Sequence, residues 1–347
     1  MSATVKTRKI SVAGHAVEIA EAGNGPALLY LHGFADVHGA SSSFMPFHAA
    51  LAKSFRVVAP AHPCCAGSDE DDDIETMDDL AFRYAETMDA LGLDKVAIAG
   101  SCVGGWIAAE LAVRHPERVT HLVLIGASGL EVPDQPIGDL FWEAQPRNGT
   151  DYSGMRRLLF GRDDLPEAVT LFPDSRGDTG RELTRYKTMR FASRIGFNPP
   201  YFYDRHLRRR LHRYGGPSLV LWGEHDRMVP RAHGEAYAKG LAGATFRVIA
   251  GAGHSPQVEQ PEETADLVRA FLKPVSPARK AAAKKTRAKS TRAKSTRAKP
   301  TRAKPTKARP KANARLQKNA RTSAAPAPAR PRSETKAKGS AKKPARR

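Results

Sequence analysis

The strongest chemical signal in the sequence is a cysteine flanked by glycines. The string GSCVG at 100–104 directly follows the apolar run 95–99 and precedes a helical run. A strand, a tight glycine-flanked turn and a helix form the setting in which a nucleophile is held in a strained backbone conformation. In the pattern glycine-x-nucleophile-x-glycine, the central residue is Cys102. Ser101 is rejected because centring the pattern on it would put the bulky, β-branched Val103 at a small-residue position.

A cysteine at this position needs neighbours that favour its thiolate. A free thiol with a pKa of about 8.5 is only a few per cent ionised at neutral pH. An imidazole nearby and the N-terminus of a helix both raise that fraction. The helix expected over 104–114 supplies the second of these, so the first has to come from elsewhere in the chain.

Further loops make the sequence resemble the α/β-hydrolase superfamily from about Lys9 to Leu272. In that superfamily the chain order is nucleophile, acid and then histidine, and this sequence follows the same order. The resemblance also rests on the LHGF string at 31–34, the His-Pro to Ser-Asp loop at 62–69, the LWGEHD string at 221–226 and the GAGH string at 251–254.

The resemblance implies a catalytic triad of Cys102, Asp226 and His254. Asp226 would hold His254 in the tautomer that accepts the thiol proton. The backbone N–H groups of Phe34 and Val103 would bind the oxyanion that develops on the substrate. Glu224 is the other candidate for the acid, but the spacing of the two residues from the preceding strand favours Asp226.

Two features depart from the pattern of the superfamily. Most members carry Ser at the elbow, whereas Cys resembles the dienelactone hydrolases, and the string CVGG also resembles the elbow of polyhydroxyalkanoate synthases, which transfer acyl groups. In addition, Cys64, Cys65 and Ala66 replace an expected Gly-Phe-Gly. A side chain is costly where the backbone needs a positive φ. We therefore expect either a remodelled loop or an altered site.

The elements that must position these residues alternate along the first 273 residues. Short apolar runs alternate with helical runs, which predicts an α/β fold with a mostly parallel central sheet and helices on both faces. Residues 9–20 predict a hairpin that turns at 13–15. The expected strands are 27–31, 55–60, 95–99, 120–125, 218–222 and 245–250. The expected helices are 44–53, 74–91, 104–114, 231–241 and 262–272.

Residues 131–214 interrupt this alternation. The segment contains Pro, Gly, aromatic and Arg residues but no clear strand, and it is too long for a loop without structure. We expect a helical cap inserted into an α/β-hydrolase domain over 1–273. The arginines of the cap are expected to form a solvated face, with selection of an anionic substrate as the alternative, and the acidic run 69–73 is expected to form a solvated helix entry.

Charge divides the chain at residue 274. The chain has 56 Lys and Arg and 36 Asp and Glu. Residues 274–347 contain 26 of the basic residues and one of the acidic residues, so this tail carries a net charge of +25. Residues 1–273 hold the remaining 30 basic and 35 acidic residues and carry −5. In the tail, a Thr-Arg-Ala-Lys-Ser/Pro repeat begins at Thr286 and recurs every five residues through Thr306, with no aromatic residue. Such a composition buries too little apolar surface to fold, so we expect a disordered polycation.

By composition alone, the tail resembles linker-histone tails and the basic extensions of bacterial nucleoid-associated proteins. Its cations would neutralise phosphates and release counterions, and it offers no ring to stack on bases. We therefore expect nonspecific binding to nucleic acid or another polyanion, with an anionic membrane surface or solubility alone as alternatives. The cations assigned to this role are Arg287, Lys289, Arg292, Lys294, Arg297, Lys299, Arg302 and Lys304.

The remaining composition narrows the class of protein. Three cysteines without Cys-x-x-Cys or Cys/His spacing indicate neither a disulfide framework nor a metal site. No apolar run approaches about 18 residues, and the N-terminus lacks a signal-peptide pattern. We expect no cofactor, no metal, a cytoplasmic location, and nucleoid association through the tail.

Together these observations predict a hydrolase that cleaves a carboxylic ester, lactone or thioester. Because the attacking atom is sulfur, the reaction would pass through a thioester acyl-enzyme, and the tail would tether the enzyme to a polyanion. Two alternatives stay open at this point. One is a catalytically inactive scaffold with the α/β-hydrolase fold, and the other is an acyltransferase that uses the same triad.

Overall fold

The computed structural model describes residues 4–145, 151–174, 179–197 and 200–273. The chain divides into two compact units, Met1–Ser276 and Pro277–Arg347, and every described residue lies in the first. The predicted tail over 274–347, with its repeats and its assigned cations, therefore lies outside the described residues.

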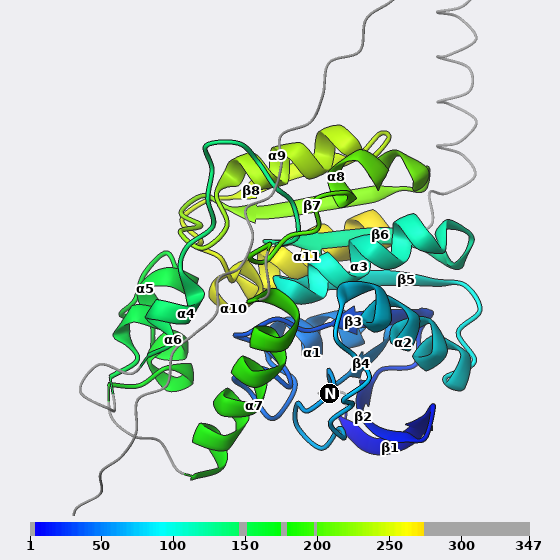
Figure 1. Ribbon diagram of the computed structural model, residues 1–347, viewed down its shortest axis with the longest axis horizontal. Coiled ribbons are helices and arrows are strands. Elements are labelled where there is room, and N and C mark those ends of the chain that lie inside the picture. The colour runs from blue at the N-terminus through cyan, green and yellow to red at the C-terminus, as the bar shows by residue number, and fades with distance from the viewer. Residues whose placement is uncertain (1–3, 146–150, 175–178, 198–199, 274–347) are drawn as a thin grey trace, which may run out of the picture. The chain divides into compact units, whose positions relative to one another are not determined.

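An eight-stranded sheet forms the centre of the first unit (Figure 1). Its strands are β1 (Lys6–Val12), β2 (His15–Ala22), β3 (Ala27–Leu31), β4 (Arg56–Pro60), β5 (Val96–Ser101), β6 (Val119–Ile125), β7 (Ser218–Gly223) and β8 (Thr245–Ile249). They lie in the order β1-β2-β4-β3-β5-β6-β7-β8. β2 pairs antiparallel with β1 and β4, and all other neighbours are parallel. The predicted mostly parallel sheet is confirmed.

Helices cover both faces of the sheet, as expected. Outside the insertion they are α1 (Pro46–Ala52), α2 (Met77–Ala90), α3 (Val103–Arg114), α9 (Arg231–Gly240), α10 (Pro256–Glu259) and α11 (Pro261–Leu272), with a 3-10 turn η1 (Pro116–Arg118). α1 packs with α11 on one face, and α2 packs with α3 on the other. Of these helices, α10 is the one that the sequence pattern did not predict.

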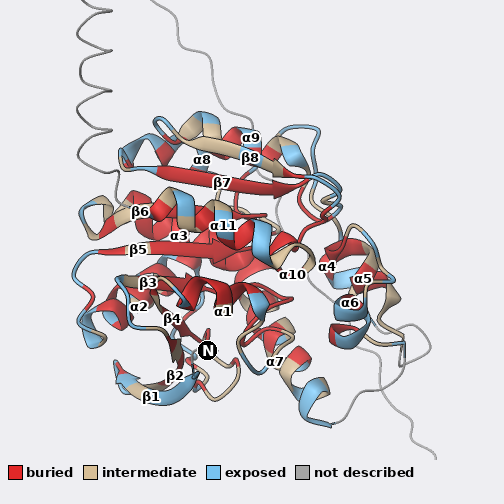
Figure 2. Cartoon of the chain, turned by 180° about the vertical axis from the view of Figure 1, so that it is seen from behind, coloured by how far each residue is buried: buried red, intermediate tan, exposed pale blue. Residues whose placement is uncertain are grey.

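The central strands are buried on both faces because their side chains alternate between two cores. In β3, Leu28 and Tyr30 pack in the cluster that includes α1 and α11. Leu29 and Leu31 point the other way, into the cluster that includes α2, α3 and α9. This period of two explains why a fully apolar run forms a strand here. Figure 2 shows β5 and β7 buried along their length.

The segment between β6 and β7 is helical in its described residues. It contains α4 (Leu140–Glu143), α5 (Ser153–Leu159), α6 (Pro166–Leu171), α7 (Thr179–Gly196), α8 (Leu207–Arg210) and the 3-10 turn η2 (Leu211–Arg213). Figure 1 shows that α4 to α7 lie beyond the carboxyl ends of the parallel strands. Ligand sites of open parallel sheets form at that edge, so these helices stand over the place where a site is expected.

Salt bridges hold α7 against the core. The guanidinium of Arg190 lies 2.5 Å from the carboxylate of Glu70, and Arg194 lies 3.2 Å from Asp72. Arg190 and Asp72 stay exposed, as expected, whereas the expectation of a solvated surface is wrong at Arg185 and Asp71, which are buried. Sequence patterning treated each segment alone, whereas the opposite charges meet across a long separation in the chain.

The turn between β5 and α3 depends on close packing of glycines. Cys102 joins the two elements with φ 53° and ψ −120°. On the first turn of α3, a Cβ added to Gly104 would lie 2.1 Å from the carbonyl oxygen of Leu31. A Cβ added to Gly100 would lie 2.3 Å from the carbonyl oxygen of Gly104. These contacts let α3 begin directly against the strands.

We predict that Gly104→Ala lowers the free energy of unfolding by about 1–3 kcal/mol or more, because backbone must move to admit the methyl group. Gly215→Ala is the matched control, since a Cβ there meets nothing within 4 Å. Its effect should stay within about 0.5 kcal/mol. Urea unfolding followed by tryptophan fluorescence measures both, and equal midpoints would contradict this description of the turn.

Candidate active site

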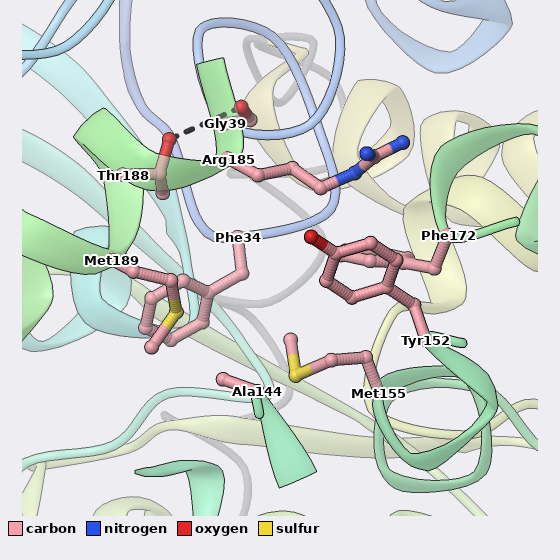
Figure 3. A pocket seen from close by; sticks show the side chains of 9 residues that line it. All are labelled: Phe34, Gly39, Ala144, Tyr152, Met155, Phe172, Arg185, Thr188 and Met189. Carbon is pink, nitrogen blue, oxygen red and sulfur yellow. Dashed lines mark hydrogen bonds between the residues drawn. The ribbon is translucent and has the colours of Figure 1, made fainter. Parts of the chain in front are cut away.

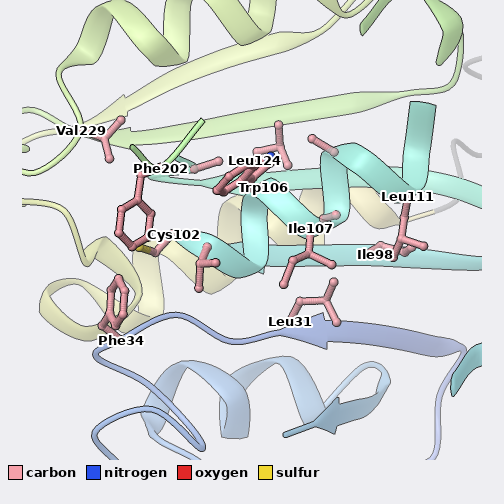
Figure 4. Packing of buried hydrophobic residues seen from close by; sticks show 14 of the residues in the cluster. Leu31, Phe34, Ile98, Cys102, Trp106, Ile107, Leu111, Leu124, Phe202 and Val229 are labelled. Atoms are coloured by element: carbon pink, nitrogen blue, oxygen red, sulfur yellow. The ribbon is translucent and has the colours of Figure 1, made fainter. Parts of the chain in front are cut away.

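Cys102 occupies the turn that the glycine pattern predicted. Its N–H donates to the carbonyl of Ile125 at 3.0 Å, and its carbonyl accepts from the N–H of Ser128 at 3.2 Å. The residue is 4% exposed and lies between the rings of Phe34 and Phe202 (Figure 4). A positive φ at a non-glycine residue is strained and is typical of functional turns.

His254 and Asp226 meet at the carboxyl edge of the sheet. Nδ1 of His254 lies 2.9 Å from Oδ2 of Asp226, and both side chains are buried. The other oxygen, Oδ1 of Asp226, accepts the N–H groups of Met228 at 3.0 Å and Val229 at 2.8 Å. These two bonds fix the carboxylate, which in turn orients the imidazole.

Glu224, the competing acid, lies elsewhere. Its Oε2 accepts the N–H of Gly251 at 2.9 Å, and its side chain is half-exposed. The residue that contacts His254 is Asp226, so the geometry agrees with the spacing argument from the sequence.

The position of His254 also brings it toward Cys102. A Cβ added to Gly126 would lie 3.3 Å from the imidazole of His254, and Gly126 follows Ile125, which accepts the N–H of Cys102. Burial disfavours the imidazolium, but the electrostatic effects of Asp226 and Cys102 outweigh it. The pKa of His254 is therefore raised well above its usual range. Its Nε2 is buried.

The two predicted oxyanion donors lie on either side of the turn. Val103 is the first residue of α3, so its N–H has no acceptor within the helix. Phe34 lies in the loop after β3, which presses against the turn at Gly33. A Cβ added to Gly33 would lie 2.8 Å from Oγ of Ser101 and 2.9 Å from Cβ of Cys102.

A cavity of about 30 Å³ opens beside Phe34, under the helices of the insertion. Its lining is mostly aromatic and thioether side chains, which point toward one another in Figure 3. They are Phe34, Tyr152, Met155, Phe172 and Met189. By this measure roughly 10–15 Å³ holds one water molecule, so the cavity has room for a small group in this conformation.

Arg185 is the charged residue in the lining of this cavity. Its Nη1 lies 2.6 Å from Oε1 of Glu182, and its Nε donates to the carbonyl of Leu171 at 3.0 Å. The guanidinium also lies 4.9 Å from the ring centroid of Tyr152. The positive charge is thus paired with a carboxylate, which leaves a largely neutral and apolar surface.

The unusual loop of Cys64, Cys65 and Ala66 keeps a left-handed backbone. The φ angles are 69° at Cys64 and 47° at Ala66, at the positions where glycine was expected. Each such residue costs about 1–2 kcal/mol. All three cysteines of the chain are free thiols, and burial raises the pKa of both Cys64 and Cys65. The loop therefore keeps positive φ at both positions, which argues against the remodelled loop; the altered site stays a prediction.

Sequence reasoning missed a buried carboxylate and a partly buried one near the site. Asp36 lies in the loop after β3, and Glu259 ends α10, five residues after His254. Glu259 accepts the N–H groups of Gly161 at 2.8 Å and Gly253 at 2.7 Å, yet burial raises its pKa to about 7. The available signal was an acidic residue inside an otherwise buried loop, close in sequence to a residue already assigned.

The described residues hold neither a metal-binding cluster nor a membrane span. No group of three or more His, Cys, Asp or Glu side chains is placed to bind a metal ion there. Within the same residues, no helix has the length and apolar character needed to cross a membrane.

Comparison with known proteins gives a consistent result. The profile of the alpha/beta hydrolase fold matches residues 26–261. A 2-hydroxymuconate semialdehyde hydrolase from Pseudomonas sp. (strain CF600) is 29% identical over 280 residues, covering 76% of this chain and 93% of that protein.

Two solved structures share the fold. One is the 2-hydroxy-6-oxo-6-phenylhexa-2,4-dienoate hydrolase from Rhodococcus sp. strain RHA1, with 21% identity, a TM-score of 0.61 and coverage of 79% and 100% of the two chains. The other is a carboxylesterase from Bacillus subtilis, with 23% identity, a TM-score of 0.63 and coverage of 78% and 92%. Because the family profile spans most of the described fold, the chain belongs to the α/β-hydrolase fold family.

Proposed function

We propose that the protein hydrolyses a carboxylic ester, lactone or thioester with Cys102 as its nucleophile. One observation carries the proposal: Cys102 lies in a strained turn at the start of α3, beside a buried His254 that is hydrogen-bonded to Asp226. The hydrolase names of the relatives support the reaction class. The cysteine in place of serine is the part specific to this chain.

The geometry supports a two-step reaction. Nε2 of His254 accepts the proton of Cys102, and the thiolate attacks the carbonyl carbon of the substrate. The N–H groups of Phe34 and Val103 stabilise the oxyanion. Collapse of this intermediate breaks the bond to the leaving group, which takes the proton from His254, and a thioester remains on Cys102. Water, deprotonated by His254, then attacks the thioester, releases the acid and returns the proton to the thiol.

The lining of the cavity beside Phe34 suits a substrate with an uncharged, apolar acyl group. Its lining is aromatic and thioether, and the guanidinium of Arg185 is already paired with Glu182. A carboxylate of the substrate buried in this cavity would find no cation in the lining that is not already paired, so its desolvation would not be compensated. We therefore favour apolar acyl esters over an anionic substrate such as the 2-hydroxymuconate semialdehyde for which the Pseudomonas relative is named.

The alternatives make different predictions. An acyltransferase would use the same acyl-enzyme but pass the acyl group to an alcohol or thiol in place of water. A scaffold without activity would leave Cys102 with the reactivity of an ordinary thiol. Product analysis with excess acceptor, and alkylation of Cys102, separate these cases from hydrolysis.

Replacing the nucleophile tests the proposal directly. Cys102→Ala should lower kcat on every substrate of a panel of short-chain and long-chain p-nitrophenyl esters, lactones and acyl-thioesters by about 10³-fold or more. Cys65→Ala is the matched control, because it removes a buried thiol that the proposal does not use. Unchanged turnover by the Cys102 variant would show that the nucleophile is another group.

The raised pKa of His254 predicts a pH profile. The raised pKa of His254 keeps an imidazolium beside Cys102 to higher pH, so alkylation of Cys102 by iodoacetamide should fall less steeply with decreasing pH than alkylation of a free thiol. A free thiol slows about tenfold for each pH unit below its pKa of about 8.5. In Asp226→Asn the carboxylate that raises the pKa of His254 is absent, so that pKa falls and the alkylation profile should shift to higher pH. A profile that does not move would contradict the assigned role of Asp226.

We also propose that residues 274–347 tether the enzyme to nucleic acid or another polyanion. The support is the charge of +25 on these residues, against −5 on residues 1–273. Nucleoid association and a cytoplasmic location belong to the same proposal.

Deleting residues 274–347 should abolish retention on immobilised duplex DNA at low salt and leave ester turnover within about threefold. The intact chain should elute at lower salt when polyphosphate competes, since binding depends on charge alone. Equal retention of the truncated chain would contradict the tether, and loss of turnover would show that the tail contributes to the site.

A further inference from the structure

Asp36 is a carboxylate with no exposed surface that the proposed reaction does not use. Its Oδ1 accepts the N–H of Gly33 at 2.8 Å, and its Oδ2 accepts the hydroxyls of Tyr30 at 2.5 Å and Ser101 at 2.6 Å. Nε2 of Gln257 donates to Oδ2 at 3.3 Å. A buried carboxylate is retained only when donors satisfy it in this way.

Three of these four donors come from segments that carry the proposed site. Gly33 precedes Phe34, the proposed oxyanion donor. Ser101 precedes Cys102, and Gln257 lies in α10, the short helix that follows His254. A single side chain therefore connects the oxyanion loop, the nucleophile turn and the histidine loop.

The backbone of Asp36 also closes the oxyanion loop. Its carbonyl accepts the N–H groups of Gly39 at 2.9 Å and Ser41 at 3.1 Å. On the other side, the absence of a side chain at Gly33 lets the loop contact Cys102 directly. The hydrogen bonds of Asp36 hold the oxyanion loop close to the nucleophile turn, and the contact of Gly33 with Cys102 limits how close the two can come.

The partners of Asp36 tolerate a neutral isostere. Burial raises the pKa of Asp36 despite its donors, so the neutral state is less costly than for an exposed acid. The Tyr30 and Ser101 hydroxyls can each accept as well as donate. Oε1 of Gln257 is buried without a partner among the described residues. If the side-chain amide of Gln257 is rotated by about 180°, this oxygen can accept a hydrogen bond from the amide of an asparagine at position 36. The substitution Asp36→Asn therefore keeps the network connected.

We propose that Asp36 is a positioning residue that holds the N–H of Phe34 at the depth where it meets the developing oxyanion. This inference rests on the proposed cysteine mechanism. It predicts a loss that appears only in reactions that form an oxyanion. Alkylation of Cys102 by iodoacetamide displaces iodide at a saturated carbon and forms none, so it reports on the nucleophile alone.

Asp36→Ala should lower kcat for p-nitrophenyl acetate by about 10²-fold, the usual loss for one oxyanion donor. KM and the alkylation rate of Cys102 should stay within about threefold, because neither depends on the oxyanion. Asp36→Asn should recover most of kcat. Near-UV circular dichroism and the unfolding midpoint establish that each variant is folded.

Asp71→Ala is the matched control, because Asp71 is a buried aspartate that pairs with Arg83 and not with any donor to Asp36. It should leave the ratio of ester turnover to alkylation unchanged. If Asp36→Ala does not fold, Ser101→Ala removes one of the donors and should lower kcat, less steeply, at constant KM.

Three results would overturn the assignment of Asp36. They are full kcat in a folded Asp36→Ala variant, parallel loss of turnover and alkylation, or an Asp36→Asn variant as impaired as Asp36→Ala. A wild-type Cys102 that reacts no faster than a free thiol is a separate result. It would overturn the cysteine mechanism itself.

Discussion

The left-handed backbone at Cys102 is the constraint around which the rest of the site is arranged. A side chain in that conformation is strained, so the surrounding structure has to hold it there. The hydrogen bond from its N–H to Ile125 and the contact of Gly104 with Leu31 fix the turn from two sides. Both partners lie on strands that are buried on both faces. The strain at one residue is therefore balanced by packing across the centre of the sheet.

Buried carboxylates extend this constraint to the loops. Asp226, Asp36 and Glu259 each accept backbone N–H groups from the loops that they connect. Such bonds offset part of the cost of removing a charge from water. Because each carboxylate accepts at least one backbone N–H, it fixes the path of the chain as well as the position of a side chain. The loops of the site lack the regular hydrogen bonds of helices and strands, and these polar contacts fix them in place.

The fold could be predicted from the sequence because its signals are local. Glycine spacing located the turn at Cys102, and the apolar runs located β3 at 27–31 and the other parallel strands within one or two residues. β5 extends to Ser101, past its expected end, because its pairing with β6 continues as far as Ile125. The Asp36 network and the contact between α7 and the acidic loop were missed because Ser101 and Gln257 in the one, and the two segments of the other, are distant in sequence. The residue pattern of one segment does not reveal which charged side chain of another segment it will contact in the folded protein.

The contacts of α7 bear on how a substrate reaches Cys102, which is 4% exposed. Arg190 of α7 pairs with Glu70, and Phe191 of the same helix stacks on the ring of His62. If a substrate enters only while these contacts are open, the apparent dissociation constant is the intrinsic one divided by the open fraction. Ionic strength weakens the salt bridge but not the stacked rings, so salt concentration would then act on affinity through the cap.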